Sequence, residues 1–286
     1  MFKKFPNTIP LHSEIIYGLV RSRRLGRSLG LNILPTSYKL CSFDCVYCQY
    51  GRTSICTLDS AHRLDDLPTQ DDFGKALESA LHEHKEIDNI TFSGNGEPTL
   101  HPQFAEMVDI AKRLKEEYFP KAKLGILSNS STVSIDKVRQ ALAKLDFRIM
   151  KLDAGGLETF RKINHPCKGV DYKNMLNSLH SLEKVTLQTM FVDGGIQNTG
   201  EREIGEWIER VGQIEPINVQ IYSLHRPPAN SSLREVPVQK LREIAAEAEQ
   251  TTGVPVEVIM AASPYRKKEK ILEIGRVRCH KGKTRG

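Results

Sequence analysis

The sequence predicts an α/β fold whose parallel strands curve into a partial or full barrel. Its 286 residues suit one α/β barrel domain. Short β-branched runs alternate with amphipathic stretches from residue 71 to 260. Small, polar and glycine-rich segments follow most of these runs. Because crossover connections between parallel strands are right-handed, such a repeat winds into one curved parallel sheet.

Each predicted strand is short and rich in Val, Ile, Leu or Phe. The strands lie at 30–34, 89–93, 123–128, 147–153, 185–192, 219–223 and 254–259. The helical patterns between them lie at 72–84, 102–118, 135–145, 171–182, 201–211 and 238–252. The carboxyl ends of parallel strands meet at one edge, so the residues that follow them should form one functional face.

Charge divides the chain into a balanced body and a basic end. The formal net charge is +6, and residues 264–286 hold nine Lys or Arg against Glu269 and Glu273. We therefore expect a barrel domain over 1–260 and a basic C-terminal extension over 261–286. Such an extension either attracts a phosphate-rich partner or is a solvated terminus.

The chain shows no secretory signal, because its first residues lack an apolar segment with a small-residue cleavage site. No apolar run is long enough to cross a membrane. These features predict a cytoplasmic protein without a membrane partner. In that reducing compartment, the six cysteines are metal ligands, catalysts or core thiols rather than disulfides.

Three cysteines, Cys41, Cys45 and Cys48, follow one another with gaps of three and two residues. This spacing can hold three corners of a cubane [4Fe-4S] cluster and leaves the fourth iron open to another ligand. A structural zinc site needs four ligands, and no second short-spaced pair is present. The other cysteines are isolated and predicted to be ordinary thiols: Cys56, Cys167 and Cys279.

The segment SGNGEPTLHP, residues 93–102, follows a predicted strand and leads into a helix. Gly94 and Gly96 let the backbone approach a ligand closely, and Pro98 biases Glu97 toward an extended conformation. A carboxylate held there can pair with a ligand ammonium. The same residues also suit a simple strand-to-helix turn, and the two interpretations are compatible.

The cysteine spacing, with Tyr47 directly before the last cysteine, resembles the radical S-adenosylmethionine (radical SAM) superfamily. The resemblance implies a partial (β/α)6 TIM-type barrel and a [4Fe-4S] cluster on the three cysteines. It also implies that SAM chelates the open iron and that Tyr47 lies near the adenine. Residues 94–97 (Gly94, Asn95, Gly96 and Glu97) resemble the family motif that contacts the methionine amino group.

Later strand ends supply further predicted cofactor contacts. Ser128 and Asn129 lie at the end of the third strand and should face the barrel mouth, as should Lys151 at the fourth. By resemblance, the fourth and fifth strands contact the ribose and carboxylate of SAM, which selects Asp153 and Gln188. These assignments depend on strand parity, since a slip of one residue sends a side chain to the other face.

The resemblance implies a reaction. One electron, from a donor such as flavodoxin or ferredoxin, would drive reductive cleavage of SAM, and the 5′-deoxyadenosyl radical would abstract hydrogen from a substrate. Segments such as KLCSFDCVYCQYG and FSGNGEPTLHP further resemble a bacterial wyosine-synthase-like group, which suggests tRNA as the substrate. The tRNA enzyme has tryptophan where this chain has Gln49, and extra cysteines ahead of the motif.

Two other functions remain open: a noncatalytic iron–sulfur electron-transfer protein and a zinc-stabilised RNA-binding protein.

A group of arginines near the cysteines forms either phosphate clamps or ion pairs that fix the N-terminal segment. They are Arg21, Arg23, Arg24 and Arg27. Among the histidines at predicted loops, His225 is the best acid–base candidate; the others are His101, His165 and His280.

Overall fold

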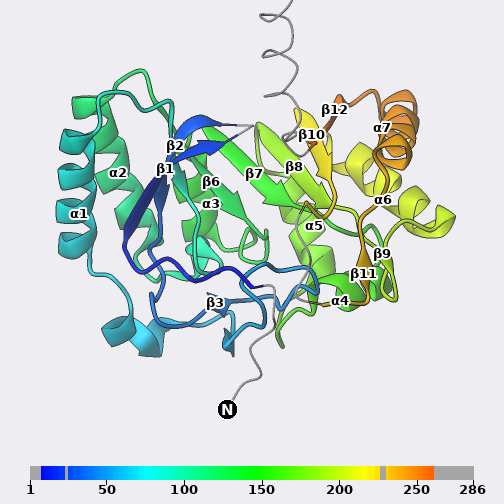
Figure 1. Cartoon of the computed structure of the whole chain (residues 1–286), viewed down its shortest axis with the longest axis horizontal. Coiled ribbons are helices and arrows are strands. Elements are labelled where there is room, and N and C mark those ends of the chain that lie inside the picture. The colour runs from blue at the N-terminus through cyan, green and yellow to red at the C-terminus, as the bar shows by residue number, and fades with distance from the viewer. Residues whose placement is uncertain (1–7, 23–24, 226–229, 261–286) are drawn as a thin grey trace, which may run out of the picture.

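An eight-stranded sheet forms the centre of the computed structural model, which describes residues 8–22, 25–225 and 230–260 (Figure 1). In spatial order the strands are β1 (Ile16–Ser22), β2 (Gly26–Leu31), β5 (Asn89–Phe92), β6 (Lys123–Ser128), β7 (Phe147–Lys151), β8 (Val185–Met190), β10 (Asn218–Tyr222) and β12 (Val256–Val258). β1 is antiparallel to β2, and each later neighbour is parallel. In the part of the chain that is described, β1 and β12 are unpaired edges of this sheet, so the barrel is partial.

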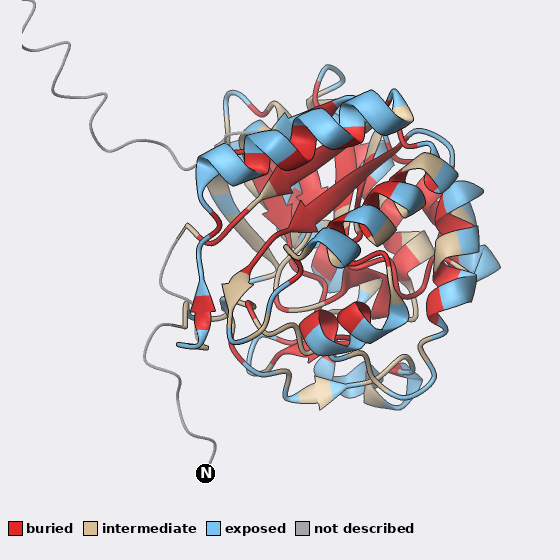
Figure 2. Ribbon diagram, turned by 90° about the vertical axis from the view of Figure 1, so that its right-hand side faces the viewer, coloured by how far each residue is buried: buried red, intermediate tan, exposed pale blue. Residues whose placement is uncertain are grey.

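Helices cover the outer face of the sheet and expose their far sides, while the strands beneath them are buried (Figure 2). The helices are α1 (Gln70–Glu83), α2 (Phe104–Tyr118), α3 (Asp136–Ala143), α4 (Leu157–Asn164), α5 (Tyr172–His180), α6 (Glu201–Ile214) and α7 (Val238–Thr252), with 3-10 turns η1 (Ala61–Asp66) and η2 (Pro98–Leu100). In α6, Ile204, Trp207 and Val211 form a buried stripe at helical spacing. The Trp207 Nε1–H donates to Thr189 Oγ1 at 3.0 Å, so its polar edge is satisfied.

Two small sheets lie at the carboxyl ends of the main strands. One joins β3 (Leu40–Cys41) to β4 (Ile55–Cys56), and the other joins β9 (Asp193–Gly194) to β11 (Leu233–Arg234). β3 also bridges to Gly96 through Leu40. The cysteine segment is therefore fastened to the loop that follows β5.

Strand alternation gives the inner face of the barrel its polar side chains. In β8, Leu187 packs in the core and its neighbour Gln188 faces the other side. Gln188 lies in register with Lys151 of β7 and with Gln220 of β10. One row across three strands thus brings a cation and two amides into the barrel.

The predicted α/β fold is confirmed, although the short strands β3, β4, β9 and β11 were not predicted and three further elements differ. The first parallel strand is Gly26–Leu31 rather than 30–34, because the chain turns out of the sheet at Asn32, whose amide donates to the carbonyls of Glu14 and Leu34. β1 was not predicted, since Gly18, at φ +100°, and a bulge interrupt its alternation. The eight-residue α4 was also not predicted, and it directly follows Gly156.

The predicted basic extension, 261–286, lies outside the described residues, so the domain boundary at 260 stays a prediction. Among the described helices, none combines the length and the apolar character that a membrane span requires.

Candidate functional site

The cysteine segment and the 94–97 loop are joined by backbone hydrogen bonds on both sides of Leu40. The Leu40 N–H donates to the Asn95 carbonyl at 3.1 Å, and the Glu97 N–H donates to the Leu40 carbonyl at 3.1 Å. Gly96 lies between these bonds at φ +152°, where a Cβ atom would come within 1.6 Å of the Leu40 carbonyl oxygen. Only glycine fits this position, and it brings Cys41 next to Glu97.

The three cysteines line one cavity of about 170 Å³ at the mouth of the barrel. Ten of the predicted site residues share it: Cys41, Cys45, Tyr47, Cys48, Gly94, Gly96, Glu97, Ser128, Asn129 and Gln188. Its other walls are Lys39, Phe43, Tyr50, Leu127, Ile149 and Lys151. Segments separated by up to 149 positions in the chain therefore converge on one space, as the parallel sheet requires.

Side-chain amides contact two of the cysteine sulfurs. Asn129 Nδ2 donates to Cys41 Sγ at 3.5 Å, and Asn164 Nδ2 donates to Cys45 Sγ at 3.3 Å. Such bonds orient metal ligands and tune the metal. Burial raises the pKa of Cys45 to about 11 and raises that of Cys41 further, so binding iron would displace protons from these thiols.

The arrangement of the cysteines suits a cluster. Within the described residues, no three Cys, His, Asp or Glu side chains converge as ligands of a single metal ion. The ligands of a cubane bind separate iron atoms, so three thiols arranged around a shared cavity match its needs.

Lys39 supplies a buried positive charge beside the three cysteines. The residue is 4% exposed, and its ammonium donates to the Gly51 carbonyl at 3.1 Å. Burial lowers the pKa of Lys39, but the cysteine sulfurs, Cys48 foremost, outweigh burial and leave the pKa above its ordinary value. A cation here stabilises thiolates. Its position two residues before Cys41 was the only sign of this role in the sequence.

Glu97 is held by donors from two strand ends. Its Oε1 accepts from the Thr99 N–H at 3.2 Å, the Thr99 hydroxyl at 2.6 Å and the Ser128 hydroxyl at 2.9 Å. Its Oε2 accepts from the Asn129 N–H at 2.5 Å and keeps lone-pair capacity for a further donor. Burial raises the pKa of Glu97, opposed by these hydrogen bonds. A ligand ammonium is the partner such a carboxylate favours.

Residues 36–211 match the family model for the radical SAM superfamily. The chain belongs to the radical SAM superfamily. It also belongs with the UPF0026 proteins, since it is 31% identical over 217 residues to one from Synechocystis sp., covering 74% of this chain and 76% of that protein. A protein named GTPase Obg from Brachyspira hyodysenteriae is 28% identical over 253 residues, 87% of this chain. The chain spans 35% of the length of that relative.

The fold is similar to solved radical SAM structures. The structure of TYW1 with a lysine-pyruvate adduct bound superposes with a TM-score of 0.54 at 14% identity, covering 79% of this chain and 74% of that one. The resemblance to the radical SAM superfamily is confirmed, and the likeness to TYW1 is one of fold.

Tyr47, the aromatic residue before the last cysteine of the radical SAM motif, lines the cavity. Its hydroxyl donates to the carboxylate of Asp153. That carboxylate also accepts from Asn164 Nδ2 at 2.7 Å and from the Met190 N–H at 2.8 Å. Burial is the main cause that raises the pKa of Tyr47 well above its ordinary value. The phenol is therefore neutral, and its ring is held in one orientation at the cavity wall.

Two predicted residues do not line the cavity. The Asp153 side chain is fully buried and engaged as above. Asn95, 0% exposed, uses its amide to donate to the His12 and Pro35 carbonyls at 2.9 Å each. In this structure they position neighbouring segments, and their contact with SAM stays a prediction.

Gln188 presents an unused donor to the cavity. Its Oε1 accepts from the Tyr222 hydroxyl at 3.1 Å, while its Nε2 is buried and has no hydrogen-bond partner in the described structure. Lys151 lies beside it, 3.6 Å from Asp153 Oδ1 and over the rings of Tyr47 and Tyr222. A buried donor of this kind requires an acceptor, which a bound ligand or water would supply.

The remaining predicted groups that the structure describes lie outside the set of residues that lines the cavity. The Cys56 and Cys167 side chains contact each other, and Cys279 is outside the described residues. Arg27 forms ion pairs with Glu86 and Asp88, as the structural interpretation predicted. Arg23, Arg24 and His280 are outside the described residues.

The described histidines at predicted loops do not line this cavity, whereas an asparagine that was not predicted contacts a cysteine. His101 is buried and bonded to the Pro68 carbonyl, and His165 is exposed at the end of α4. The His225 ring lies 6.3 Å from that of Tyr222 and outside the set that lines the cavity. Asn164, which touches Cys45, was missed because no motif marks it and α4 was not predicted.

Proposed function

We propose that this chain holds a [4Fe-4S] cluster on Cys41, Cys45 and Cys48 and uses it with SAM to start radical chemistry on a substrate. The observation that carries this proposal is the single cavity shared by the three cysteines and Glu97. Membership of the radical SAM superfamily supports it.

The residues that line the cavity have different roles in the proposed reaction. When bound, the cluster and SAM would supply one-electron cleavage of a carbon–sulfur bond, and the resulting 5′-deoxyadenosyl radical would abstract hydrogen from the substrate. Glu97 Oε2 accepts a hydrogen bond from the ligand ammonium, and Gln188 Nε2 donates one to an oxygen or nitrogen of the same ligand. Phe43, Leu127 and Ile149 give the cavity apolar walls that exclude water.

Anaerobic reconstitution with iron and sulfide tests the proposal. A brown protein that releases 5′-deoxyadenosine from SAM after reduction with dithionite supports it. A brown protein that leaves SAM intact supports the noncatalytic electron-transfer function instead. A colourless protein that retains zinc supports the zinc-stabilised RNA-binding function.

For the substrate we propose tRNA, the class that the wyosine-synthase-like resemblance suggests. The support is the net charge of +6 and the basic extension. Arg27 does not contribute, because Glu86 and Asp88 already pair with it. Mass spectrometry of tRNA nucleosides from a deletion strain tests this: a lost modification supports tRNA, and an unchanged set of nucleosides contradicts it. We also propose that the protein is located in the cytoplasm, because its cysteine thiols stay reduced there.

A further inference from the structure

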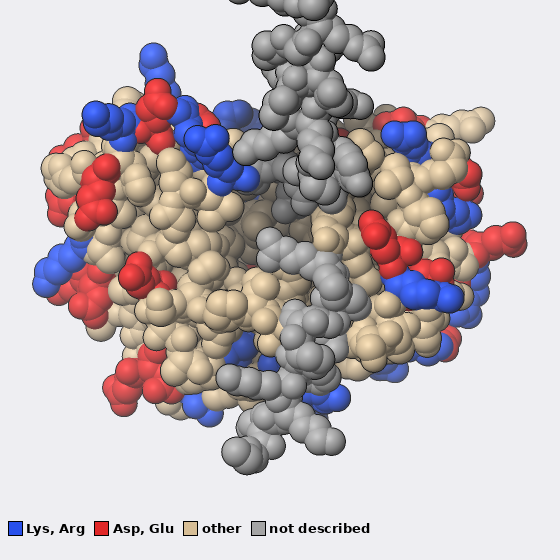
Figure 3. Space-filling model, in the orientation of Figure 1, with Lys and Arg blue, Asp and Glu red and all other residues tan. Residues whose placement is uncertain are grey.

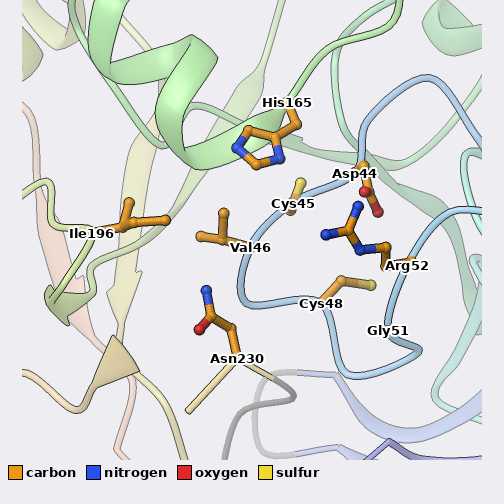
Figure 4. A pocket seen from close by; sticks show the side chains of 9 residues that line it. All are labelled: Asp44, Cys45, Val46, Cys48, Gly51, Arg52, His165, Ile196 and Asn230. Atoms are coloured by element: carbon orange, nitrogen blue, oxygen red, sulfur yellow. The ribbon is translucent and has the colours of Figure 1, made fainter. Parts of the chain in front are cut away.

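A second cavity, of about 370 Å³, opens on the cysteine loop from outside (Figure 4). Its lining combines the loop with His165, directly after α4, and with residues further along the chain: Asp44, Cys45, Val46, Cys48, Gly51, Arg52, His165, Ile196 and Asn230. Cys45 and Cys48 line both cavities, whereas Cys41 and Glu97 line the inner one alone. The outer cavity therefore reaches two ligand sulfurs without passing through the proposed SAM site.

We infer that the outer cavity is the docking surface for the electron donor, an acidic protein that carries a flavin or an iron–sulfur centre; this rests on the function proposed above. One electron leaves the donor, whose reduced centre is oxidised by one electron. It enters the centre held by Cys45 and Cys48, which is reduced by one electron. No proton or group is transferred in this step.

The charge around the opening favours an acidic partner. Arg52 lines the cavity, and two further cations, Arg161 and Lys168, lie four residues before and three residues after the lining residue His165 in the sequence. These three side chains are exposed, and among the described residues they form no ion pair. The one carboxylate in the lining is Asp44, which accepts from the Thr53 N–H at 2.7 Å.

The segment that carries these cations is fixed to the cysteine loop. The Asp44 N–H donates to the His165 carbonyl at 3.1 Å, and the Val46 N–H donates to the Ile163 carbonyl at 2.9 Å. The Cys167 N–H donates to the carbonyl of Ser42, next to Cys41, at 2.8 Å. Several Lys and Arg side chains are visible along the lower margin of Figure 3, where β3 and α4 lie in Figure 1. The positive charge is thus held at a constant place relative to the ligand cysteines.

A small charged opening suits a redox protein that binds transiently better than a subunit that binds permanently. Electron-transfer complexes use small, weak interfaces, and their rim charges act mainly on the association rate and its salt dependence. A nucleic acid would also be attracted to these cations, so the experiment must separate the two kinds of partner.

The test uses the reconstituted holoenzyme and a bacterial flavodoxin as the probe. The variants are Arg52→Glu, Lys168→Glu and their combination. Arg242→Glu on α7 is the matched control, since Arg242 is also exposed and forms no ion pair in the described structure. For each protein, flavodoxin binding is measured against salt concentration, and 5′-deoxyadenosine release is driven either by reduced flavodoxin or by dithionite.

The double variant should bind flavodoxin about tenfold more weakly, with a shallower salt dependence. Its flavodoxin-driven release should fall in parallel, while dithionite-driven release stays at the wild-type level. Unchanged flavodoxin binding, an equal loss with dithionite, or a loss confined to tRNA binding would each overturn the docking site. A wild-type holoenzyme inactive with dithionite would instead overturn the proposed function, and the docking inference with it.

Discussion

The hydroxyl of Tyr47 donates to the carboxylate of Asp153, 106 residues further along the chain. The same carboxylate accepts from Asn164 at the end of α4 and from the N–H of Met190 at the end of β8. One buried group thus ties the cysteine loop to two other parts of the barrel mouth. Because an unpaired buried carboxylate is costly, the loop is held where these donors meet.

Replacing Tyr47 by Phe should lower the free energy of unfolding by about 2 kcal/mol, because Asp153 loses a buried donor. Denaturant titration measures the change. Tyr38→Phe is the control, since its hydroxyl donates to Asp66 near the surface, and it should cost well under about 1 kcal/mol. Equal effects of the two substitutions would show that Tyr47 and Asp153 do not anchor the loop.

Replacing Cys45 by Ala should remove both the brown colour of the reconstituted protein and its cleavage of SAM. Cys45 lines the cavity, whereas Cys56 lies outside it, so Cys56→Ala should retain both properties. Iron and sulfide content, the visible spectrum and 5′-deoxyadenosine release give the comparison. Loss of the cluster in the Cys56 variant would mean that the ligand set is assigned wrongly.

Gly96→Ala should destabilise the protein by about 3 kcal/mol or more, because its Cβ would overlap the Leu40 carbonyl oxygen. In contrast, Gly205→Ala within α6 places its Cβ where no atom lies within 4 Å, and it should stabilise the helix by about 0.5–1 kcal/mol. Thermal and urea unfolding of both variants check this. A neutral Gly96→Ala would contradict the close contact between the two loops.

Glu97→Gln should weaken SAM binding by about tenfold or more, since an ammonium loses its ionic partner. Burial raises the pKa of Glu97, so wild-type affinity should fall as pH drops through that raised value and the carboxylate takes up a proton. Calorimetry on the reconstituted protein between pH 8 and pH 5 measures both effects. The exposed Glu117→Gln is the control, and an equal response in both variants would rule out the proposed contact.

His101 should make the fold less stable in mild acid. Burial lowers the pKa of His101 to about 4, below the value of 6.5 in an unfolded chain. The unfolded state therefore binds more protons below pH 6.5, and stability is lost as pH falls from there toward 4. The loss is about 2 kcal/mol at pH 5.

Urea unfolding of His101→Gln at pH 7 and pH 5 isolates this effect, because the other histidines are common to both proteins. The difference between the two pH values should shrink by about 2 kcal/mol in the variant. An unchanged difference would show that His101 titrates normally.

The sequence by itself determined the parallel strands, the three-cysteine segment and Glu97. Each of these is visible as a pattern within one short segment of the chain. Strand β1 escaped prediction because a bulge and Gly18 disrupt its period. Asn164 escaped because its contact with Cys45 spans 119 residues and leaves no local signal.

Tertiary structure alone decided which side chains share the cavity. Gln188 and Asp153 were both predicted to contact SAM, but the structure places them differently. Gln188 faces the cavity with a free donor. The Asp153 carboxylate already accepts hydrogen bonds from Tyr47, Asn164 and the Met190 backbone. A strand pattern gives the face of a side chain, but the partners it meets depend on other strands and loops. Whether a polar group is satisfied by protein or left for a ligand is therefore a property of the packed molecule.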